Sequence, residues 1–238
     1  MKPDYEITIE KETVLNTALE RLLKEEPIQY IIGKTEFYGL PFNVNKHTLI
    51  PRPETEELVE WVLNTTEKEE KLNIIDIGTG TGCIPISLKK HLPNTNISAI
   101  DVSEDALKIA ELNAKLNNID INFIRKDILE TEQLTQMYDV IVSNPPYVRN
   151  LEKVEIKNNV LENEPHLALF VDDNNPLIFY DKIADLAKLH LSENGLLFFE
   201  INQYLGKETV KMLKDKGFNN IELKKDFSGN DRMIKASF

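Results

Sequence analysis

The chain has 238 residues, enough for one large domain or for one domain with a small appendage, and its 41% hydrophobic and 29% charged residues are ordinary for a globular protein. Its 28 basic and 40 acidic residues give a net charge of −12, the opposite sign to that of proteins that grip nucleic acid unaided. The single cysteine, Cys83, excludes an internal disulfide, and four scattered histidines without ligand spacing argue against a zinc or haem site.

The N-terminal part of the chain predicts a few short elements. Residues 1–11 lack the apolar core of a secretory signal and no apolar run reaches the roughly 20 residues of a membrane span, so we expect a cytoplasmic protein. Apolar residues at helical spacing predict a helix over residues 13–24, and residues 35–46 predict a hairpin. A second short helix is predicted over residues 54–63. We assign residues 1–66 to this extension and interpret the charged run at residues 67–71 as a solvated linker.

From residue 72 onward strands and helices alternate. The predicted strands cover residues 72–77, 97–101, 121–124, 139–142, 195–201, 220–225 and 232–238, and the predicted helices cover residues 83–91, 181–191 and 208–216, with a further helix N-capped by Ser103. Such alternation implies a mostly parallel sheet with helices on both faces, and the last two strands, with no helix between them, imply an antiparallel edge. The predicted fold of residues 67–238 is therefore α/β, a Rossmann-like seven-stranded sheet with an antiparallel C-terminal edge.

A glycine-rich turn follows the first strand of this sheet. The strand and turn contain Asp76, Gly78, Thr79, Gly80, Thr81 and Gly82. Glycines let the backbone turn sharply and approach a ligand closely, and Asp101, at the end of the next strand, can accept hydrogen bonds from both hydroxyls of a ribose. The alternatives are a turn that only tightens strand-to-helix packing and an Asp101 that only caps a helix.

The spacing within the turn narrows the choice of nucleotide. A dinucleotide fingerprint requires glycine or alanine where Cys83 stands, and no lysine follows as in a P-loop. The pattern favours a nucleoside without a pyrophosphate. S-adenosylmethionine is such a ligand, with a cationic sulfonium that suits an acidic site and a carboxylate that suits a helix N-terminus.

The second motif, SNPPYVRN at residues 143–150, follows an apolar strand. It places Asn144 at the carboxyl edge of the sheet, where ligands bind in open α/β folds. Neither Pro145 nor Pro146 has an N–H group and both have a fixed φ, so the Asn144 side-chain oxygen and the Pro145 carbonyl form a rigid pair of acceptors. Two acceptors match the two hydrogens of an NH₂ group, and Tyr147 offers a flat face to a planar group. The alternative is a Pro-Pro turn that merely ends a strand.

An amide or aromatic NH₂ group is a poor nucleophile because its lone pair is delocalised. Holding both of its hydrogens orients the nitrogen towards an electrophilic methyl group, which is catalysis by positioning and not by a general base. The two motifs together predict transfer of a methyl group to such a nitrogen.

The chain resembles the release-factor glutamine methyltransferases, the HemK/PrmC family of class I S-adenosylmethionine-dependent enzymes. The resemblance runs from about Glu26 to the end. It is carried by PIQYIIG at residues 27–33, FYGL at 37–40, LIPRPETE at 49–56, DIGTGTG at 76–82, SNPPY at 143–147, Glu164-Pro165, Ala168-Leu169 and Asp231-Arg232. The stretch at residues 49–56 is the most specific of these, because SNPPY is shared with adenine-N6 methyltransferases.

The resemblance implies methylation of the side-chain amide nitrogen, N5, of the glutamine in the Gly-Gly-Gln motif of peptide chain release factors, a step connected with translation termination. It assigns S-adenosylmethionine to Asp76, Gly78, Thr79, Gly80, Thr81, Gly82, Asp101, Asp127, Ile128 and Asn144. It assigns the substrate glutamine to Asn144, Pro145, Pro146 and Tyr147, with Arg52, Pro53 and Glu54 lining the entrance. The last three could instead form an ordinary strand-to-helix junction at the surface. Arg232 is interpreted as a structural ion-pair partner.

The resemblance also implies an N-terminal helical domain that helps to dock the release factor, and the residues before Pro27 suffice for one helix and a tail. We expect a monomer with no nucleic-acid or membrane partner. Two other functions remain open: methylation of adenine or cytosine amino groups in nucleic acid, with Tyr147 stacking on a flipped base, and a non-catalytic module that only binds the cofactor.

Overall fold

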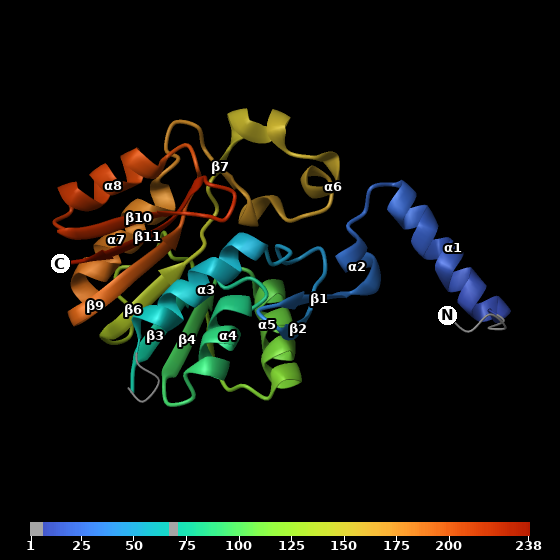
Figure 1. The fold of residues 1–238 in the computed structure, drawn as a ribbon, viewed down its shortest axis with the longest axis horizontal. Helices are drawn as coiled ribbons and strands as arrows, with labels where there is room; N and C mark the ends of the chain where they lie inside the picture. Colours follow the sequence, from blue (N-terminus) through green and yellow to red (C-terminus); the bar gives the residue numbers. More distant parts are fainter. Residues whose placement is uncertain (1–6, 67–70) are drawn as a thin grey trace.

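The computed structural model describes residues 7–66 and 71–238. Within these residues the helices are α1 Ile9–Leu23, α2 Ile28–Ile32, α3 Pro53–Thr65, α4 Cys83–His91, α5 Glu104–Asn117, α6 Asn158–Leu161, α7 Ile178–His190 and α8 Gly206–Asp215 (Figure 1). The strands are β1 Lys34–Phe37, β2 Leu40–Asn43, β3 Asn73–Ile77, β4 Asn96–Asp101, β5 Asn122–Arg125, β6 Tyr138–Ser143, β7 Val148–Arg149, β8 Phe170–Val171, β9 Leu191–Glu200, β10 Asn220–Lys225 and β11 Asp231–Ser237.

The central sheet has seven strands in the order β10-β11-β9-β6-β3-β4-β5. Strands β9, β6, β3, β4 and β5 run parallel, whereas β11 pairs antiparallel with both β9 and β10. The predicted α/β fold with an antiparallel C-terminal edge is confirmed. The strand order reverses between β3 and β6, and ligands bind at such a switch point in open α/β sheets.

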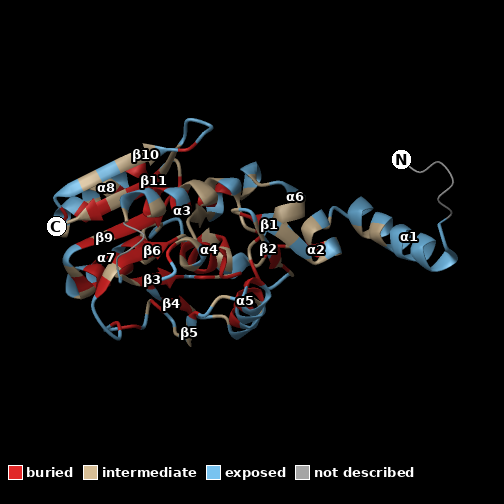
Figure 2. Cartoon of the chain, turned by 60° about the horizontal axis from the view of Figure 1, so that its bottom comes forward, coloured by how far each residue is buried: buried red, intermediate tan, exposed pale blue. Residues whose placement is uncertain are grey.

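Alternate residues of each parallel strand face two separate hydrophobic cores. Ile74 and Val140 point to the face covered by α3, α4 and the hairpin β1–β2, whereas Ile75 and Ile141 point to the face covered by α7 and α8. Figure 2 shows the strands as the most buried layer, between helices that are exposed on their outer sides. Both faces are thus dry, which explains why most residues of these strands are apolar; Asp76 in β3 and Ser98 in β4 are buried polar exceptions.

The hairpin and α3 belong to the same core as the sheet. Phe37 and Phe42 of the hairpin and Leu58 and Trp61 of α3 are buried in one cluster with residues of β3, β6 and β9. The hairpin and this helix confirm two sequence predictions. The division of the chain at residue 66 stays a prediction, and of the charged run at 67–71 all but Lys71 lies outside the described residues.

The helix predicted over residues 13–24 is present but begins earlier, at Ile9. The side chain of Thr8 accepts a hydrogen bond from the backbone N–H of Lys11 and so caps the helix, a signal that apolar periodicity does not contain. Helix α1 buries none of its residues and extends away from the body of the molecule (Figure 1).

The sequence missed several short elements and misplaced one junction. Helix α2, the 3₁₀ turns Asn150–Glu155 and His166–Ala168, helix α6 and the β7–β8 pair are all too short to show a periodic apolar pattern. Leu191, predicted at the end of a helix, begins β9, because that strand shifts register against β6 and takes in the residues before Gly195. In the described part of the chain no helix is long and apolar enough to cross a membrane, and no three metal-binding side chains cluster.

Candidate active site

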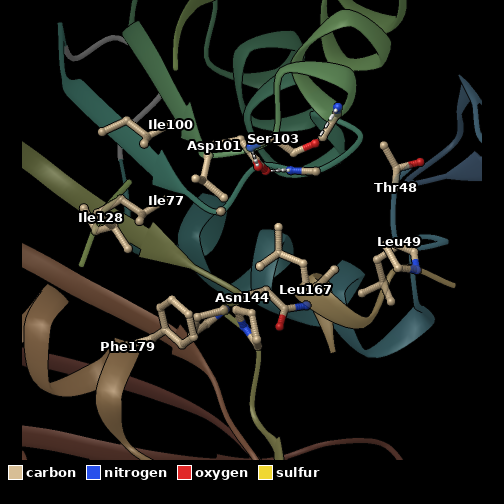
Figure 3. A pocket seen from close by; sticks show the side chains of 18 of the residues that line it. Thr48, Leu49, Ile77, Ile100, Asp101, Ser103, Ile128, Asn144, Leu167 and Phe179 are labelled. Atoms are coloured by element: carbon tan, nitrogen blue, oxygen red, sulfur yellow. Dashed lines mark hydrogen bonds between the residues drawn. The ribbon is translucent and has the colours of Figure 1, made fainter. Parts of the chain in front are cut away.

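A cavity opens at the switch point between β3 and β6. It encloses about 1010 Å³ of empty space with its open mouth included. Its walls come from the loops after β2, β3, β4, β5 and β6, from the 3₁₀ turn His166–Ala168 and from α7. Figure 3 shows side chains from these segments, among them Asp101, Asn144, Thr48 and Phe179, arranged around this one space. Elements far apart in the sequence therefore share one site.

The glycine loop after β3 has the backbone that a ligand needs. Gly78, Gly80 and Gly82 all have positive φ, at 80°, 54° and 78°. Gly78 and Gly80 line the cavity. Gly82 is required for packing instead, since a Cβ there would lie 3.0 Å from Ile86 and 3.2 Å from Ala110. Part of the predicted cofactor loop thus faces the cavity, and the rest holds α4 against α5.

Asp101, at the end of β4, lies beside this loop. One carboxylate oxygen accepts the backbone N–H of Gly80 at 2.8 Å and the other accepts that of Ser103 at 2.9 Å, as the dashed lines in Figure 3 indicate. A carboxylate has about four acceptor positions, so each oxygen can accept a further hydrogen bond from a ligand. Burial raises the pKa of Asp101, so an ionised Asp101 gains from such donors.

The rest of the cofactor side of the cavity is largely apolar. Ile77, Ile100 and Phe179 line it together with the predicted residues Asp127 and Ile128. Ile128 is buried, whereas Asp127 is exposed and accepts the backbone N–H of Leu129. Apolar side chains next to a carboxylate fit a nucleoside, whose base is largely apolar on its faces and whose ribose carries two hydroxyls.

Three predicted cofactor residues lie behind the cavity wall. Asp76, Thr79 and Thr81 are buried and do not belong to the lining. Both carboxylate oxygens of Asp76 lack a hydrogen-bond partner among the described residues, and burial raises its pKa to about 7. These residues support the loop from within the fold.

The corner after β6 brings Asn144, Pro145 and Pro146 into the wall of the cavity. Asn144 lies next to the glycine loop, because a Cβ on Gly78 would come within 4.0 Å of the Asn144 backbone oxygen. Within the described chain, no donor reaches the Asn144 side-chain oxygen or the Pro145 carbonyl. Both acceptors are therefore available. Tyr147, predicted to offer its ring to the substrate, is not among the residues that line the cavity: it packs against the core on the α7 side, and its hydroxyl donates to Glu200 at 3.1 Å.

The three predicted entrance residues are placed at the start of α3. Pro53 is the first residue of the helix and is exposed, and Glu54 lies in the first turn. The guanidinium of Arg52 contacts the buried carboxylate of Glu164 at 2.6 Å. Glu164 also accepts the backbone N–H of Ile50 at 3.1 Å. The pair thus joins the 49–52 loop to the segment that carries Pro165 and Leu167 into the cavity.

The loop over residues 46–49 lines the cavity, and the sequence did not indicate it. Helix α2 holds this loop, because the buried hydroxyl of Tyr30 donates to the Thr48 carbonyl at 2.6 Å. Tyr30 and Thr48 are 18 residues apart, so no local sequence pattern could predict this contact.

Two polar residues close to Asn144, Thr55 and Glu200, were not predicted from the sequence. The hydroxyl of Thr55 donates to Glu200 at 2.6 Å and accepts a hydrogen bond from the Asn144 amide at 3.2 Å. A signal existed for Glu200, since a carboxylate at the end of an apolar strand has to find donors in the fold. Arg232 forms the predicted structural ion pair, with Asp226 at 3.0 Å.

Comparisons with known proteins agree with this geometry. The model of the "Methyltransferase small domain" family matches residues 56–169. A release factor glutamine methyltransferase of Flavobacterium psychrophilum is 59% identical over 241 residues, covering 100% of this chain and 85% of the relative. This chain belongs to the release factor glutamine methyltransferases. A member of that family from Bacteroides thetaiotaomicron is 43% identical, again over 100% of this chain and 85% of the relative.

Among solved structures, the catalytic domain of hMettl16 in complex with an RNA hairpin has a TM-score of 0.67. It shares 18% sequence identity and covers 89% of this chain and 80% of its own. At this identity the likeness concerns the methyltransferase fold alone. The family assignment rests on the sequence relatives, and the cavity at the switch point is where this family's fold places its site.

Proposed function

We propose that this protein transfers a methyl group from S-adenosylmethionine to the N5 amide nitrogen of the glutamine in the Gly-Gly-Gln motif of peptide chain release factors. The observation that carries the proposal is the shared cavity. The glycine loop and Asp101 form part of its wall, and Asn144 and Pro145 present two unengaged acceptors to the same space. Membership of the release factor glutamine methyltransferases supports the choice of substrate.

The residues present fit the cofactor. Gly78 and Gly80 allow close approach of a ligand to the backbone, the carboxylate of Asp101 can accept hydrogen bonds from ribose hydroxyls, and Ile100 and Ile128 offer apolar contacts to a base. When bound, S-adenosylmethionine supplies an electrophilic methyl group on sulfur, and the electron pair of the broken S–C bond stays on that sulfur.

The protein contributes position and electrostatics. The Asn144 side-chain oxygen and the Pro145 carbonyl each accept one hydrogen of the substrate NH₂ group, so that the nitrogen lone pair is directed across the cavity. The fixed φ of Pro145 and Pro146 holds these acceptors before the substrate arrives, and such preorganisation lowers the barrier. No basic side chain is required at the nitrogen, because methylation makes its N–H acidic and the proton then leaves readily to water.

Mass spectrometry of a release factor incubated with the protein and S-adenosylmethionine tests the proposal. We expect one added methyl group on the glutamine of its Gly-Gly-Gln motif. Replacing Asn144 with alanine removes one acceptor and should lower the rate by about 10²–10³-fold, the cost of losing a preorganised hydrogen-bonding group. The exposed Asn230→Ala serves as the control and should retain the wild-type rate. Methyl label found only in RNA or DNA, or equal rates for the two variants, would overturn the proposal.

A further inference from the structure

The Glu200 carboxylate is the centre of a buried polar cluster beside Asn144. Glu200 ends β9 and is 1% exposed. One of its oxygens accepts the hydroxyl of Thr55 at 2.6 Å, and the other accepts the hydroxyl of Tyr147 at 3.1 Å. Thr55 lies in the first turn of α3 and is 3% exposed. Glu200 and Thr55 are therefore shielded from solvent, and the partners of their side chains are protein groups.

The chemistry of this cluster fixes the direction of each hydrogen bond. An ionised carboxylate is an acceptor only, so the single proton of the Thr55 hydroxyl must be directed at Glu200. The Thr55 oxygen then has only lone pairs left for its other neighbour. Burial raises the pKa of Glu200, while the hydrogen bond from Thr55 and the charge of Arg232 favour its ionised form.

This direction determines which end of the Asn144 amide faces the cavity. The NH₂ nitrogen of Asn144 lies 3.2 Å from the Thr55 oxygen. The reversed amide would set two acceptors against each other, and an unpaired buried polar group costs about 1–3 kcal/mol. The nitrogen and oxygen of an amide are hard to tell apart by shape, so hydrogen-bond partners decide its orientation. Here the only arrangement that satisfies Thr55 leaves the Asn144 oxygen for a ligand.

We propose that Thr55 and Glu200 are positioning residues that hold the Asn144 amide with its oxygen towards the substrate NH₂ group. This inference rests on the proposed function, because a substrate NH₂ group needs acceptors. Without Thr55 and Glu200, the Asn144 amide could turn its own NH₂ group towards the cavity. Two NH₂ groups, both hydrogen-bond donors, would then face each other, and no hydrogen bond between Asn144 and the substrate could form. Because Glu200 also accepts the hydroxyl of Tyr147, one carboxylate anchors both ends of the corner at residues 144–147.

The test compares two buried threonines. Thr55→Val removes the hydroxyl at nearly constant volume, and Thr55→Ser retains it. The matched control is Thr209→Val in α8, where a fully buried hydroxyl donates to the Leu205 carbonyl away from the cavity. For each variant kcat/KM is measured with a release factor, the Kd of S-adenosylhomocysteine by calorimetry, and Tm by thermal unfolding.

We expect Thr55→Val to lower kcat/KM by about 2–10-fold, less than the loss of a preorganised group, because an amide without its orienting partner is less well held but still adopts the productive orientation up to about half of the time. The Kd of S-adenosylhomocysteine should stay within about twofold of wild type, Tm should match that of Thr209→Val, and Thr55→Ser should restore most of the activity. Glu200→Gln is the second variant. Its amide can donate as well as accept, so it no longer fixes the direction of the hydrogen bond with Thr55. It should show the same loss of kcat/KM as Thr55→Val, with the affinity for S-adenosylhomocysteine retained.

Wild-type kcat/KM in both Thr55→Val and Glu200→Gln would overturn the inference. So would a loss of activity in Thr55→Val that Thr55→Ser does not restore, because packing and not the hydroxyl would then be responsible. These outcomes leave the proposed function intact as long as the wild-type protein methylates the release factor and Asn144→Ala does so about 10²–10³-fold more slowly. Failure of the wild-type protein to methylate a release factor would count against the proposed function itself.

Discussion

Helix α3 lies against the central sheet with Leu58 and Val62 fully buried, whereas α1 projects from the body with Leu15 at 55% and Leu19 at 52% exposure (Figure 2). Both helices carry apolar residues at helical spacing. The difference is that α3 begins at Pro53 directly after a loop tied to Glu164 and therefore runs along the core. An apolar stripe thus shows which side of a helix favours burial, but the tertiary structure decides whether anything covers it.

The largest expected effect comes from the same substitution in both helices. Leu58→Ala leaves a cavity in the core and should lower the free energy of unfolding by about 3–5 kcal/mol. Leu19→Ala, on the exposed helix, should change it by less than about 0.5 kcal/mol. Urea denaturation of both variants checks this. Similar losses of unfolding free energy in the two variants would mean that α1 is buried in solution, and the two helices would then not differ in burial.

The second prediction compares a buried with an exposed carboxylate. The pKa of Asp76 is raised to about 7 in the folded protein, against about 3.9 in an unfolded chain, so the folded state binds the proton more tightly. The stability from this group is fully present below about pH 4 and is lost as the pH rises through about 7. Between pH 5 and pH 8 the ligand-free protein should lose about 3 kcal/mol through Asp76.

Denaturation curves at the two pH values measure this loss. Asp76→Asn should reduce the pH dependence by the Asp76 contribution of about 3 kcal/mol, because a neutral amide has no proton to bind, while Asp101 and Glu200, whose pKa values are also raised, keep theirs. Asp120→Asn, at an exposed position, should keep the wild-type slope. An unchanged slope in Asp76→Asn would show that Asp76 finds a partner in solution.

The smallest effect concerns ion pairs. Arg52→Ala leaves the buried carboxylate of Glu164 with only the Ile50 N–H and should cost about 1–3 kcal/mol of stability. It should also weaken binding of S-adenosylhomocysteine, since the pair holds two walls of the cavity together. Lys108→Ala removes an exposed cation that contacts Glu104 and Asp105 and should cost less than about 0.5 kcal/mol. Calorimetry measures both the unfolding of the two variants and their binding of S-adenosylhomocysteine. Equal stabilities and equal affinities for Arg52→Ala and Lys108→Ala would contradict this prediction.

Much of the site could be predicted from local sequence because its residues stand at the ends of strands. Asp101 is the last residue of β4 and Asn144 directly follows β6, and the carboxyl ends of parallel strands meet at one edge of the sheet. Thr55 could not be found in this way. It lies 89 residues from Asn144 in the chain, and only the packing of α3 on the sheet brings the two together.

The sequence by itself determined the alternation of strands and helices, the glycine loop and the rigid corner at Asn144, because each depends on residues within one turn or one strand. Only the tertiary structure decided which oxygen of the site is left for a ligand and which apolar helix is covered. The physical reason is that hydrogen-bond direction and burial are properties of neighbours in space. Here those neighbours, such as Glu200 at Thr55, come from distant parts of the chain.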